Sequence, residues 1–437
     1  MREMKDSGVE WIGEMPAGWK TARVKNVAAT MQSGGTPDSS NDSFYVDKEY
    51  GIPWVAIADM SATAYVTDTN KYISEDARYS KNLKVFPPGT ILYAMYASVG
   101  KVAELAVPAT INQALLAIEL RNNINNSFFK YALNAWEPYI ISESNGTTQN
   151  NLNASKVANL FVPLPCLQEQ EILARLLDLR RTKVDTLIQN VQTQIEKLKT
   201  YKQSLITEVV TKGLDPTVPM KDSGVEWIGE IPEHWSVAAL KYFTDILPGY
   251  AFSSNDFHTE AGVPLLRGVN VTPNGIRWED TVYWNKEITD NLKPFILQLD
   301  DIVVGLDRPW ISEGTRITRM KGKDLPSLLL QRVCRIRVKG FMDSSWVFLW
   351  IASNAFKESL STETTGISVP HISTKQIGDF IVAIPPIEVQ KEICEFIDAK
   401  CSQIDRLIAI KQAKIEKLEQ YKRSLIYEYV TGKKEVV

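Results

Sequence analysis

The sequence predicts a mixed α/β (α+β) protein with an internal pseudo-twofold duplication, in which two variable domains with short strands are joined by two long antiparallel coiled-coil helices. Three observations lead to this prediction. A motif near the N-terminus recurs in the middle of the chain, a long segment with helical period recurs without a gap, and the residues between them form short β-type runs separated by glycine, proline, asparagine and aspartate. With 437 residues, 44% of them apolar, the chain is long enough for two or three domains with real cores.

The first repeat is a segment that we call the tryptophan motif. Residues 4–14 recur without change as residues 220–230, and Trp19 recurs as Trp235. Because a period of about 220 residues is too long for a solenoid, the repeat indicates a duplicated domain. We therefore expect two similar frames that carry two different surfaces.

The second repeat predicts two long helices. Residues 146–210 align without a gap with residues 366–430, and the apolar residues late in each copy recur with helical period, many of them seven residues apart. About 40 residues form a rod of roughly 60 Å, and a rod with a narrow apolar seam needs a partner. We expect the two helices to pair antiparallel, with Lys202 and Lys422 fixing the register on the seam, although each helix could instead lie on its own domain. The residues predicted for helix pairing and partner docking are Val184, Ile188, Val191, Ile195, Leu198, Leu205, Ile404, Ile408, Ile415, Leu418 and Leu425.

The repeats divide the chain into four segments. Proline precedes both predicted helices, and Gly213 and Gly432 are placed to end them. The predicted segments are a variable domain over residues 1–164 with its tryptophan motif at 4–20, a helix over 165–213, a variable domain over 214–384 with its motif at 220–236, and a helix over 385–437. Strands are predicted over 52–57, 90–97, 112–120, 263–266, 301–306 and 329–338, and short helices near 127–134 and 345–353.

Composition excludes several classes of protein. The formal net charge is −3, so bulk electrostatics do not by themselves favour binding to nucleic acid or to an anionic membrane, although a local patch could still act. The N-terminus is too polar for a signal peptide, and no run of about 18 apolar residues could span a membrane. Four cysteines without a CxxC spacing and three scattered histidines predict neither a disulfide framework nor a metal site. We expect a reduced, cytoplasmic protein with no membrane partner.

The second variable domain has the clearer nucleic-acid chemistry. Residues 267–339 contain thirteen Lys and Arg against nine Asp and Glu, and the strand that begins near residue 333 is rich in arginine. Arginine can bind guanine through two hydrogen bonds, and a tryptophan can wedge against sugar and base. The candidate DNA-binding residues of this domain are Arg267, Arg308, Trp310, Ser312, Arg316, Gln331 and Arg332.

The first variable domain offers a different set of candidates. Asn112 and Gln113 stand at the equivalent strand start, and side-chain amides can read adenine. The remaining candidates are Tyr93, Tyr96, Ser98 and Lys101 in the analogous loop, with Lys71, Arg78, Lys81 and Lys84 as possible phosphate contacts. Each candidate in either domain could instead be an ordinary surface residue, Trp310 could belong to the core, and His371 is expected to be structural rather than catalytic.

Motifs of autonomous catalysis are missing from the sequence. It contains no GxxxxGK[ST] phosphate loop, no Asn/Asp-Pro-Pro-aromatic run that could hold a flipped base, and no convincing nuclease motif. We therefore expect a protein that is not an enzyme by itself.

The repeated motifs resemble those of the specificity subunits of type I restriction–modification systems. The resemblance rests on the segment Gly-Val-Glu-Trp-Ile-Gly-Glu-x-Pro-x-x-Trp and on Ile-Glu-Lys-Leu-x-x-Tyr-Lys-x-Ser-Leu-Ile, each of which occurs twice, and it spans the whole chain. The Asp-Arg-Pro-Trp-Ile-Ser loop of residues 307–312 and the strand of residues 328–333 look like one subclass of the target-recognition domains in that family. The first domain has Tyr-Ala-Met-Tyr at residues 93–96 instead.

The resemblance implies a non-catalytic subunit that binds double-stranded DNA. Each variable domain would be a target-recognition domain reading one half of a bipartite, asymmetric site. The helices would act as a spacer and dock two modification (methyltransferase) subunits, which restriction subunits would join. S-adenosylmethionine, ATP and magnesium would bind to those partners, and this chain would hold no cofactor. A DNA-recognition subunit of a type IIB-like system and a protein-interaction scaffold remain alternatives.

Overall fold

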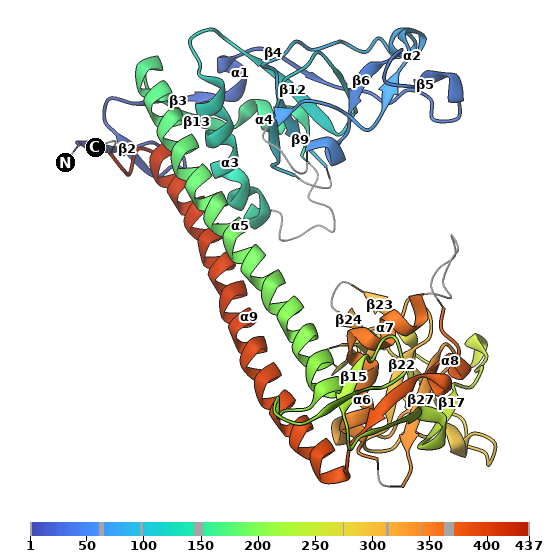
Figure 1. Ribbon diagram of the computed structural model, residues 1–437. Coiled ribbons are helices and arrows are strands. Elements are labelled where there is room, and N and C mark those ends of the chain that lie inside the picture. Colours follow the sequence, from blue (N-terminus) through green and yellow to red (C-terminus); the bar gives the residue numbers. More distant parts are fainter. Residues whose placement is uncertain are drawn as a thin grey trace. The chain divides into compact units, whose positions relative to one another are not determined.

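The computed structural model describes residues 2–60, 65–96, 99–143, 152–273, 275–311, 314–340, 342–361 and 371–435, which form two compact units (Figure 1). Unit 1 contains residues 1–192 and 413–437, and unit 2 contains residues 193–412. Each unit therefore combines one variable domain with a segment of both long helices.

The variable domain of unit 1 is a mixed α/β fold built on two sheets. The five-stranded sheet has the order β4 (Ala28–Ser33), β12 (Leu115–Leu120), β9 (Ile91–Ala94), β10 (Val102–Leu105) and β7 (Tyr65–Val66). The four-stranded sheet has the order β11 (Thr110–Ile111), β6 (Ile52–Val55), β8 (Tyr72–Ile73) and β5 (Tyr45–Val46). The helices are α1 (Val24–Val27), α2 (Glu75–Ser80), α3 (Asn126–Glu143) and α4 (Ala154–Asn159), and a separate pair joins β3 (Lys20–Arg23) to β13 (Phe161–Leu164).

The variable domain of unit 2 repeats this plan with different loops. Its four-stranded sheet has the order β17 (Thr244–Pro248), β27 (Val333–Val338), β22 (Ile302–Gly305) and β25 (Ile317–Arg319), and its three-stranded sheet has the order β21 (Val282–Trp284), β18 (Val263–Leu266) and β26 (Leu328–Leu329). Short pairs join β19 (Val271–Thr272) to β20 (Gly275–Ile276), β23 (Trp310–Ile311) to β24 (Gly314–Thr315), and β16 (Ser236–Ala239) to β28 (Ile381–Ile384). The helices are α6 (Ser344–Ala352), α7 (Asn354–Ser361) and α8 (Thr374–Asp379).

The two long helices are α5 (Leu167–Lys212) and α9 (Ile387–Val430). Each begins just after a proline and ends at a glycine with positive φ, Gly213 (77°) and Gly432 (71°). Because a residue with a Cβ is strained in this left-handed conformation, glycine is the residue that ends a helix here at least cost. The predicted helix ends are confirmed.

Within each unit the segments of α5 and α9 run antiparallel. In unit 1, Leu177 shares a core cluster with Val430, and eight residues later along α5 Asp185 binds the ammonium of Lys422 at 3.0 Å, eight residues earlier along α9. In unit 2, Lys202 binds Asp405 at 2.7 Å. The prediction that both lysines lie on the seam is confirmed.

The two seam ion pairs are copies of one another. Asp185 and Asp405 are equivalent positions of the duplication, as are Lys202 and Lys422, so each helix supplies the aspartate in one unit and the lysine in the other. The residues predicted for helix pairing differ in burial: Val184, Ile188, Val191, Ile195, Ile404 and Leu425 are buried, and Leu198, Leu205, Ile408, Ile415 and Leu418 are half-buried. Leu425 and Leu205 pack in the core clusters of units 1 and 2. The helices also pack on their own domains, since the core clusters of both units include residues of α5 and α9.

A buried glutamine attaches the start of each helix to its domain. Gln170 accepts a hydrogen bond from the backbone N–H of Asn125 at 2.9 Å and donates to the carbonyl of Pro165 at 2.9 Å. Gln390 makes the equivalent pair of bonds, with Asp343 and Pro385. Because a buried amide costs free energy unless it is paired, these hydrogen-bonded side chains fix where each helix leaves its sheet.

The tryptophan motifs hold the other ends of the helices. In unit 1, the end of α9 at Gly432 packs against Trp19, and in unit 2 the end of α5 at Gly213 packs against Trp235. The other tryptophan of each motif donates its indole N–H to a strand, Trp11 to the carbonyl of Phe161 at 3.0 Å and Trp227 to that of Ile381 at 3.2 Å. The motif recurs because each helix end requires the same partner.

Reversing the charge at one seam position is expected to destabilise the protein in a way that its partner can repair. In Lys422→Asp the new carboxylate faces Asp185 and Glu419, which lie 3.0 and 2.8 Å from the native ammonium, and we expect the melting temperature to fall. Adding Asp185→Lys should recover part of the loss, with a coupling energy of about 0.5–3 kcal/mol in a double-mutant cycle. Additive effects of the two substitutions would contradict the pairing.

Candidate nucleic-acid interface

In unit 2, two exposed arginines lie at adjacent ends of two neighbouring strands. Arg308 follows β22, and Arg332 precedes β27, which pairs with β22 in the sheet. Gln331 stands beside Arg332 and is also exposed. We call these three residues the arginine lip.

Backbone hydrogen bonds hold the two sides of the arginine lip together. The N–H of Leu306 donates to the carbonyl of Arg332 at 2.9 Å, and the N–H of Gln331 donates to that of Tyr250 at 2.9 Å. Arg308 and Arg332 both have positive φ, 46° and 67°, a conformation that costs an L-residue free energy. The lip is therefore a pre-formed arrangement rather than a flexible loop with two free cations.

The carboxylate of Asp307 connects the arginine lip to His371. It accepts hydrogen bonds from Arg332 Nη1 at 2.6 Å and pairs with His371 Nδ1 at 2.7 Å. The bond with His371, followed by the bond with Arg332, holds the pKa of Asp307 below its usual value, so the carboxylate is charged at neutral pH. His371, expected to be structural, lies beside the predicted DNA-binding residues.

Three of the predicted DNA-binding residues of unit 2 have partners within the domain. The Arg316 guanidinium donates to the carbonyls of Gly268, Val271 and Asp307, and burial lowers its pKa. Arg267 is half-buried and donates to the carbonyl of Asp280, and Trp310 is half-buried and packs against Phe356. Arg316 is thus engaged within the fold, while Arg267 and Trp310, each half-buried, stay predictions as base contacts. Ser312 lies outside the described residues.

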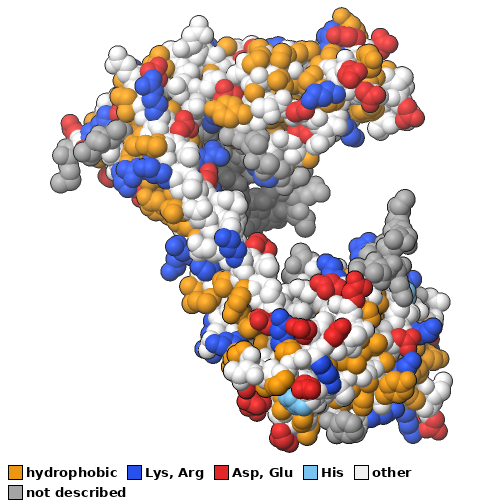
Figure 2. Space-filling view, viewed as in Figure 1, with side chains coloured by type: hydrophobic (Ala, Val, Ile, Leu, Met, Phe, Trp, Pro, Cys, Tyr) orange, Lys and Arg blue, Asp and Glu red, His pale blue; other side chains and the backbone are white. Residues whose placement is uncertain are grey.

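The arginines of β27 are also engaged within the domain. Arg335 pairs with Asp245, and Arg337 binds Asp301 through two bonds of 2.7 Å. Both guanidiniums are thus neutralised by aspartates inside unit 2. On the face in view, basic and acidic side chains are interspersed over both units (Figure 2).

Unit 1 places different side chains at the strand start where unit 2 places Gln331 and Arg332. The N–H of Asn112 donates to the carbonyl of Val55 as that of Leu330 donates to Leu266, and the N–H of Gly34 donates to the carbonyl of Leu115 as that of Gly249 donates to Val333. Gln113 therefore corresponds to Gln331 and Ala114 to Arg332, so the predicted equivalence of Asn112 and Gln113 with Gln331 and Arg332 is wrong by one residue. Asn112 accepts a bond from the N–H of Ala114 at 3.1 Å, and the exposed Gln113 accepts one from Thr36.

The predicted aromatic loop of unit 1 is only partly available. Tyr93 is fully buried in β9, because strand alternation directs its side chain into the core, and we withdraw it as a contact. Tyr96 is 37% exposed, and Lys101 is exposed. Ser98 lies outside the described residues.

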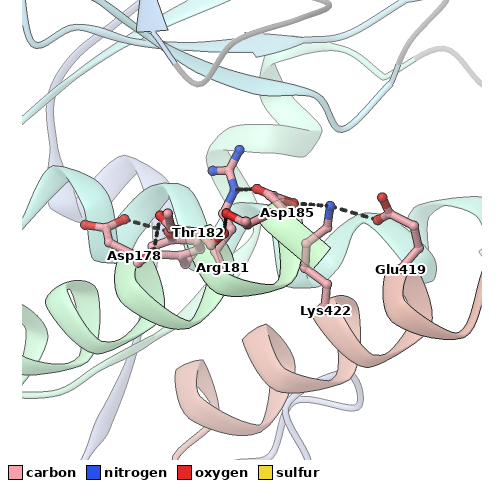
Figure 3. Close-up of polar contacts among 8 residues, drawn as sticks. Asp178, Arg181, Thr182, Asp185, Glu419 and Lys422 are labelled. Carbon is pink, nitrogen blue, oxygen red and sulfur yellow. Dashed lines mark hydrogen bonds and ion pairs between the residues drawn. The ribbon is translucent and has the colours of Figure 1, made fainter. Parts of the chain in front are cut away.

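Lys101 lines a pocket of about 930 Å³ between the variable domain of unit 1 and the helices. The acidic residues of its wall are already bound: Asp178 accepts from the Tyr131 hydroxyl at 2.6 Å, and Asp185 and Glu419 flank the ammonium of Lys422 (Figure 3). Arg423 also lines the pocket and was missed in the sequence, although the repeat gives a signal, because the equivalent residue of the first helix is Gln203.

The remaining cations of unit 1 differ in their availability. Lys81 is exposed, and Lys71 is exposed with its ammonium 5.5 Å from the ring of Tyr45. Arg78 pairs with Glu75 at 2.6 Å, and Lys84 pairs with Glu119. Lys71 and Lys81 thus remain the freer of the predicted phosphate contacts.

The described part of the chain contains no cluster of three or more His, Cys, Asp or Glu side chains that could hold a metal ion. The four cysteines are free. Within the same residues, none of the helices combines the length and the apolar character needed to cross a lipid bilayer.

Comparison with known proteins gives consistent results. A sequence profile described as "Type I restriction modification DNA specificity domain" matches residues 16–199 and 232–420. The chain is 31% identical over 325 residues to the type I restriction enzyme MjaVIII specificity subunit of Methanocaldococcus jannaschii, with 74% of each chain covered. It is 26% identical over 450 residues to the putative type I restriction enzyme MjaX specificity subunit of that organism, with 97% of this chain and 95% of the relative covered. A solved chain from a study of assembly and conformational transition of the type I R-M system shares the fold, with a TM-score of 0.67 at 15% identity over 95% of this chain and 98% of that one.

Replacing Arg316 is expected to change stability. Arg316→Ala removes a side-chain donor from three backbone carbonyls, and we expect a loss of about 1–3 kcal/mol in the free energy of unfolding, seen as a lower melting temperature. Arg308→Ala is the matched control, because this exposed guanidinium should leave the melting temperature unchanged. An equal effect of the two substitutions would show that Arg316 does not hold the loops.

Proposed function

Because this chain belongs to the type I restriction modification DNA specificity family, we propose that it binds double-stranded DNA as a non-catalytic specificity subunit and reads a bipartite, asymmetric site. Each variable domain reads one half-site. The proposal is supported by a frame that occurs twice with near-identical anchors and by loops that differ between the two copies. Loops on a fixed scaffold are the usual carriers of specificity.

The arginine lip is the observation that carries the proposal for the second domain. Arg308 and Arg332 are exposed, and both are held in a left-handed backbone conformation that glycine would adopt more easily. Because this backbone conformation costs an arginine free energy, we infer that the side chain has a function there. A guanidinium can donate to both guanine acceptors, O6 and N7. We therefore assign guanine recognition to this domain.

The first domain reads its half-site with different groups. Gln113 and Tyr96 occupy the corresponding region, and an amide can form two hydrogen bonds with adenine. Lys101, Lys71 and Lys81 are assigned to phosphates, which position the duplex without selecting a sequence. The two half-sites therefore differ in base content.

The exposed face of the helices is assigned to two modification (methyltransferase) subunits. The equivalent leucines Leu187 and Leu407 are about half exposed, and so are the equivalent tyrosines Tyr201 and Tyr421. Antiparallel pairing gives each unit one leucine and one tyrosine of this set, Leu187 with Tyr421 and Leu407 with Tyr201. Two copies of the same apolar pair support the docking of two identical partners.

The remaining components belong to the partners in this proposal. S-adenosylmethionine is assigned to the modification subunits, and ATP and magnesium to restriction subunits that join them. We place the assembly in the cytoplasm, where it meets chromosomal DNA.

Removing an arginine of the lip should affect one half-site only. With Arg308→Ala or Arg332→Ala, we expect discrimination in the second half-site to fall by about 1–3 kcal/mol while the first half-site is read as before. The measurement is selection from a randomised duplex library by the chain assembled with its modification partner, at fixed salt. Equal losses in both half-sites would contradict the assignment of one domain to each.

Charging the exposed leucines should remove partner subunits one at a time. Leu187→Asp is expected to leave one modification subunit bound, and Leu187→Asp with Leu407→Asp to leave none, since each change costs about 2 kcal/mol or more at a docking centre. Native mass spectrometry gives the stoichiometry. Leu299→Asp, at an exposed leucine of the second variable domain, is the control and should retain two partners.

A further inference from the structure

Asp307 is an acidic residue within the surface assigned to DNA. Its carboxylate lies beside Arg308 in sequence, binds Arg332 Nη1 at 2.6 Å and pairs with His371 at 2.7 Å. A negative charge near phosphates weakens binding to any duplex. Its presence in this surface therefore needs a reason other than affinity.

We propose that Asp307 is a positioning residue for base reading, holding the guanidinium of Arg332 in one orientation and thereby setting the base preference of the second domain. This inference rests on the proposed DNA-reading function. The carboxylate uses Nη1 alone, which leaves Nη2 and Nε for another partner. A guanine presents O6 and N7 to those donors.

The ion pair does little to hold the loop. Backbone bonds already connect Leu306 with Arg332 at 2.9 Å, and Ile372 with Leu306 at 2.9 Å. The Arg332 side chain is 72% exposed, and ion pairs at such exposure contribute little to stability. What remains for the pair to determine is the direction of the guanidinium.

Orientation has a large effect on an arginine at this position. A free arginine samples many rotamers and loses their entropy when it binds a base, whereas a guanidinium held before binding has lost part of it already. The positive φ of Arg332 sets the direction of its Cα–Cβ bond, and the bond to Asp307 sets the position of its guanidinium. The two constraints together pre-form a donor pair for one base edge.

The first domain has no equivalent of this arrangement. The N–H of Met95 donates to the carbonyl of Ala114 at 2.9 Å, which is the bond that Leu306 makes with Arg332 in the second domain. Tyr96 therefore stands where Asp307 stands, and Ala114 where Arg332 stands. The first half-site accordingly serves as an internal control for any substitution of Asp307.

The test compares Asp307→Asn, Arg332→Ala and the double variant, each assembled with the modification partner. The probe is a duplex library randomised over both half-sites, and a random-sequence duplex measures non-specific binding. We expect Asp307→Asn to lower the preference at one base pair of the second half-site at least about fivefold, the same base pair that Arg332→Ala affects, with no further loss in the double variant. Binding to the random duplex should stay equal or tighten, because a negative charge is lost, and the melting temperature should not change.

Asp379→Asn is the matched control, because Asp379 pairs with Lys241 at 2.6 Å on the surface of the same unit. It should leave the preference in both half-sites unchanged. If Arg332→Ala relaxes the preference and Asp307→Asn does not, the positioning role is wrong and the proposed function stands. If neither variant alters the second half-site, both the role of Asp307 and the assignment of Arg332 to base reading are wrong. A loss of binding to all duplexes alike in Asp307→Asn would also overturn the inference.

Discussion

The antiparallel seam between the two long helices is the constraint on which the rest of the structure depends. In each unit an aspartate of one helix meets a lysine of the other, Asp185 with Lys422 and Asp405 with Lys202. These partly exposed pairs add little free energy, and the buried apolar residues of the seam supply the stability. What the charges add is register, because a slip by one turn would separate each lysine from its aspartate. Register in turn fixes which helix end meets which tryptophan motif.

The duplication explains why so much of the frame could be predicted from the sequence. Repeated features such as the tryptophan motif and the seam lysines are visible in a single chain, since two copies act as a two-member comparison. The glycines that end both long helices followed from that comparison, whereas the strand starts were aligned one residue out, because the backbone bonds match Asn112 with Leu330 and not with Gln331. Gln170 and Gln390 were equally visible as repeats, but their role was not, because a glutamine in an amphipathic helix reads as a surface residue until its burial is known.

The candidate site was harder to predict because an arginine can either face solvent and bind a ligand or hydrogen-bond within the fold. Arg308 and Arg316 lie in one stretch of sequence and look alike, yet one is exposed and the other donates to three carbonyls. Nothing local distinguishes them, since the acceptors of Arg316 come partly from another loop. Tyr93 was misread for a different reason: β9 is buried on both faces, with Ile91 and Tyr93 in one core cluster and Leu92 and Ala94 in another, which the sequence alone did not show. The roles of Asp307 and His371 could not be predicted, because they depend on a contact between residues 64 positions apart in the sequence.

The same internal use of cations separates affinity from specificity in this protein. Arg335 and Arg337 lie in the strand that begins at the lip, but both are paired with aspartates, so they add little to the attraction for phosphates. With a formal net charge of −3, the chain has no general electrostatic reason to bind a duplex. Under the proposed function, such a subunit gains little from random DNA, and the arginine lip then accounts for a larger share of binding at the right sequence. In the proposed assembly the partner subunits add DNA contacts of their own. Weak non-specific binding by this chain then leaves the selection of the site to the loops that differ between the two domains.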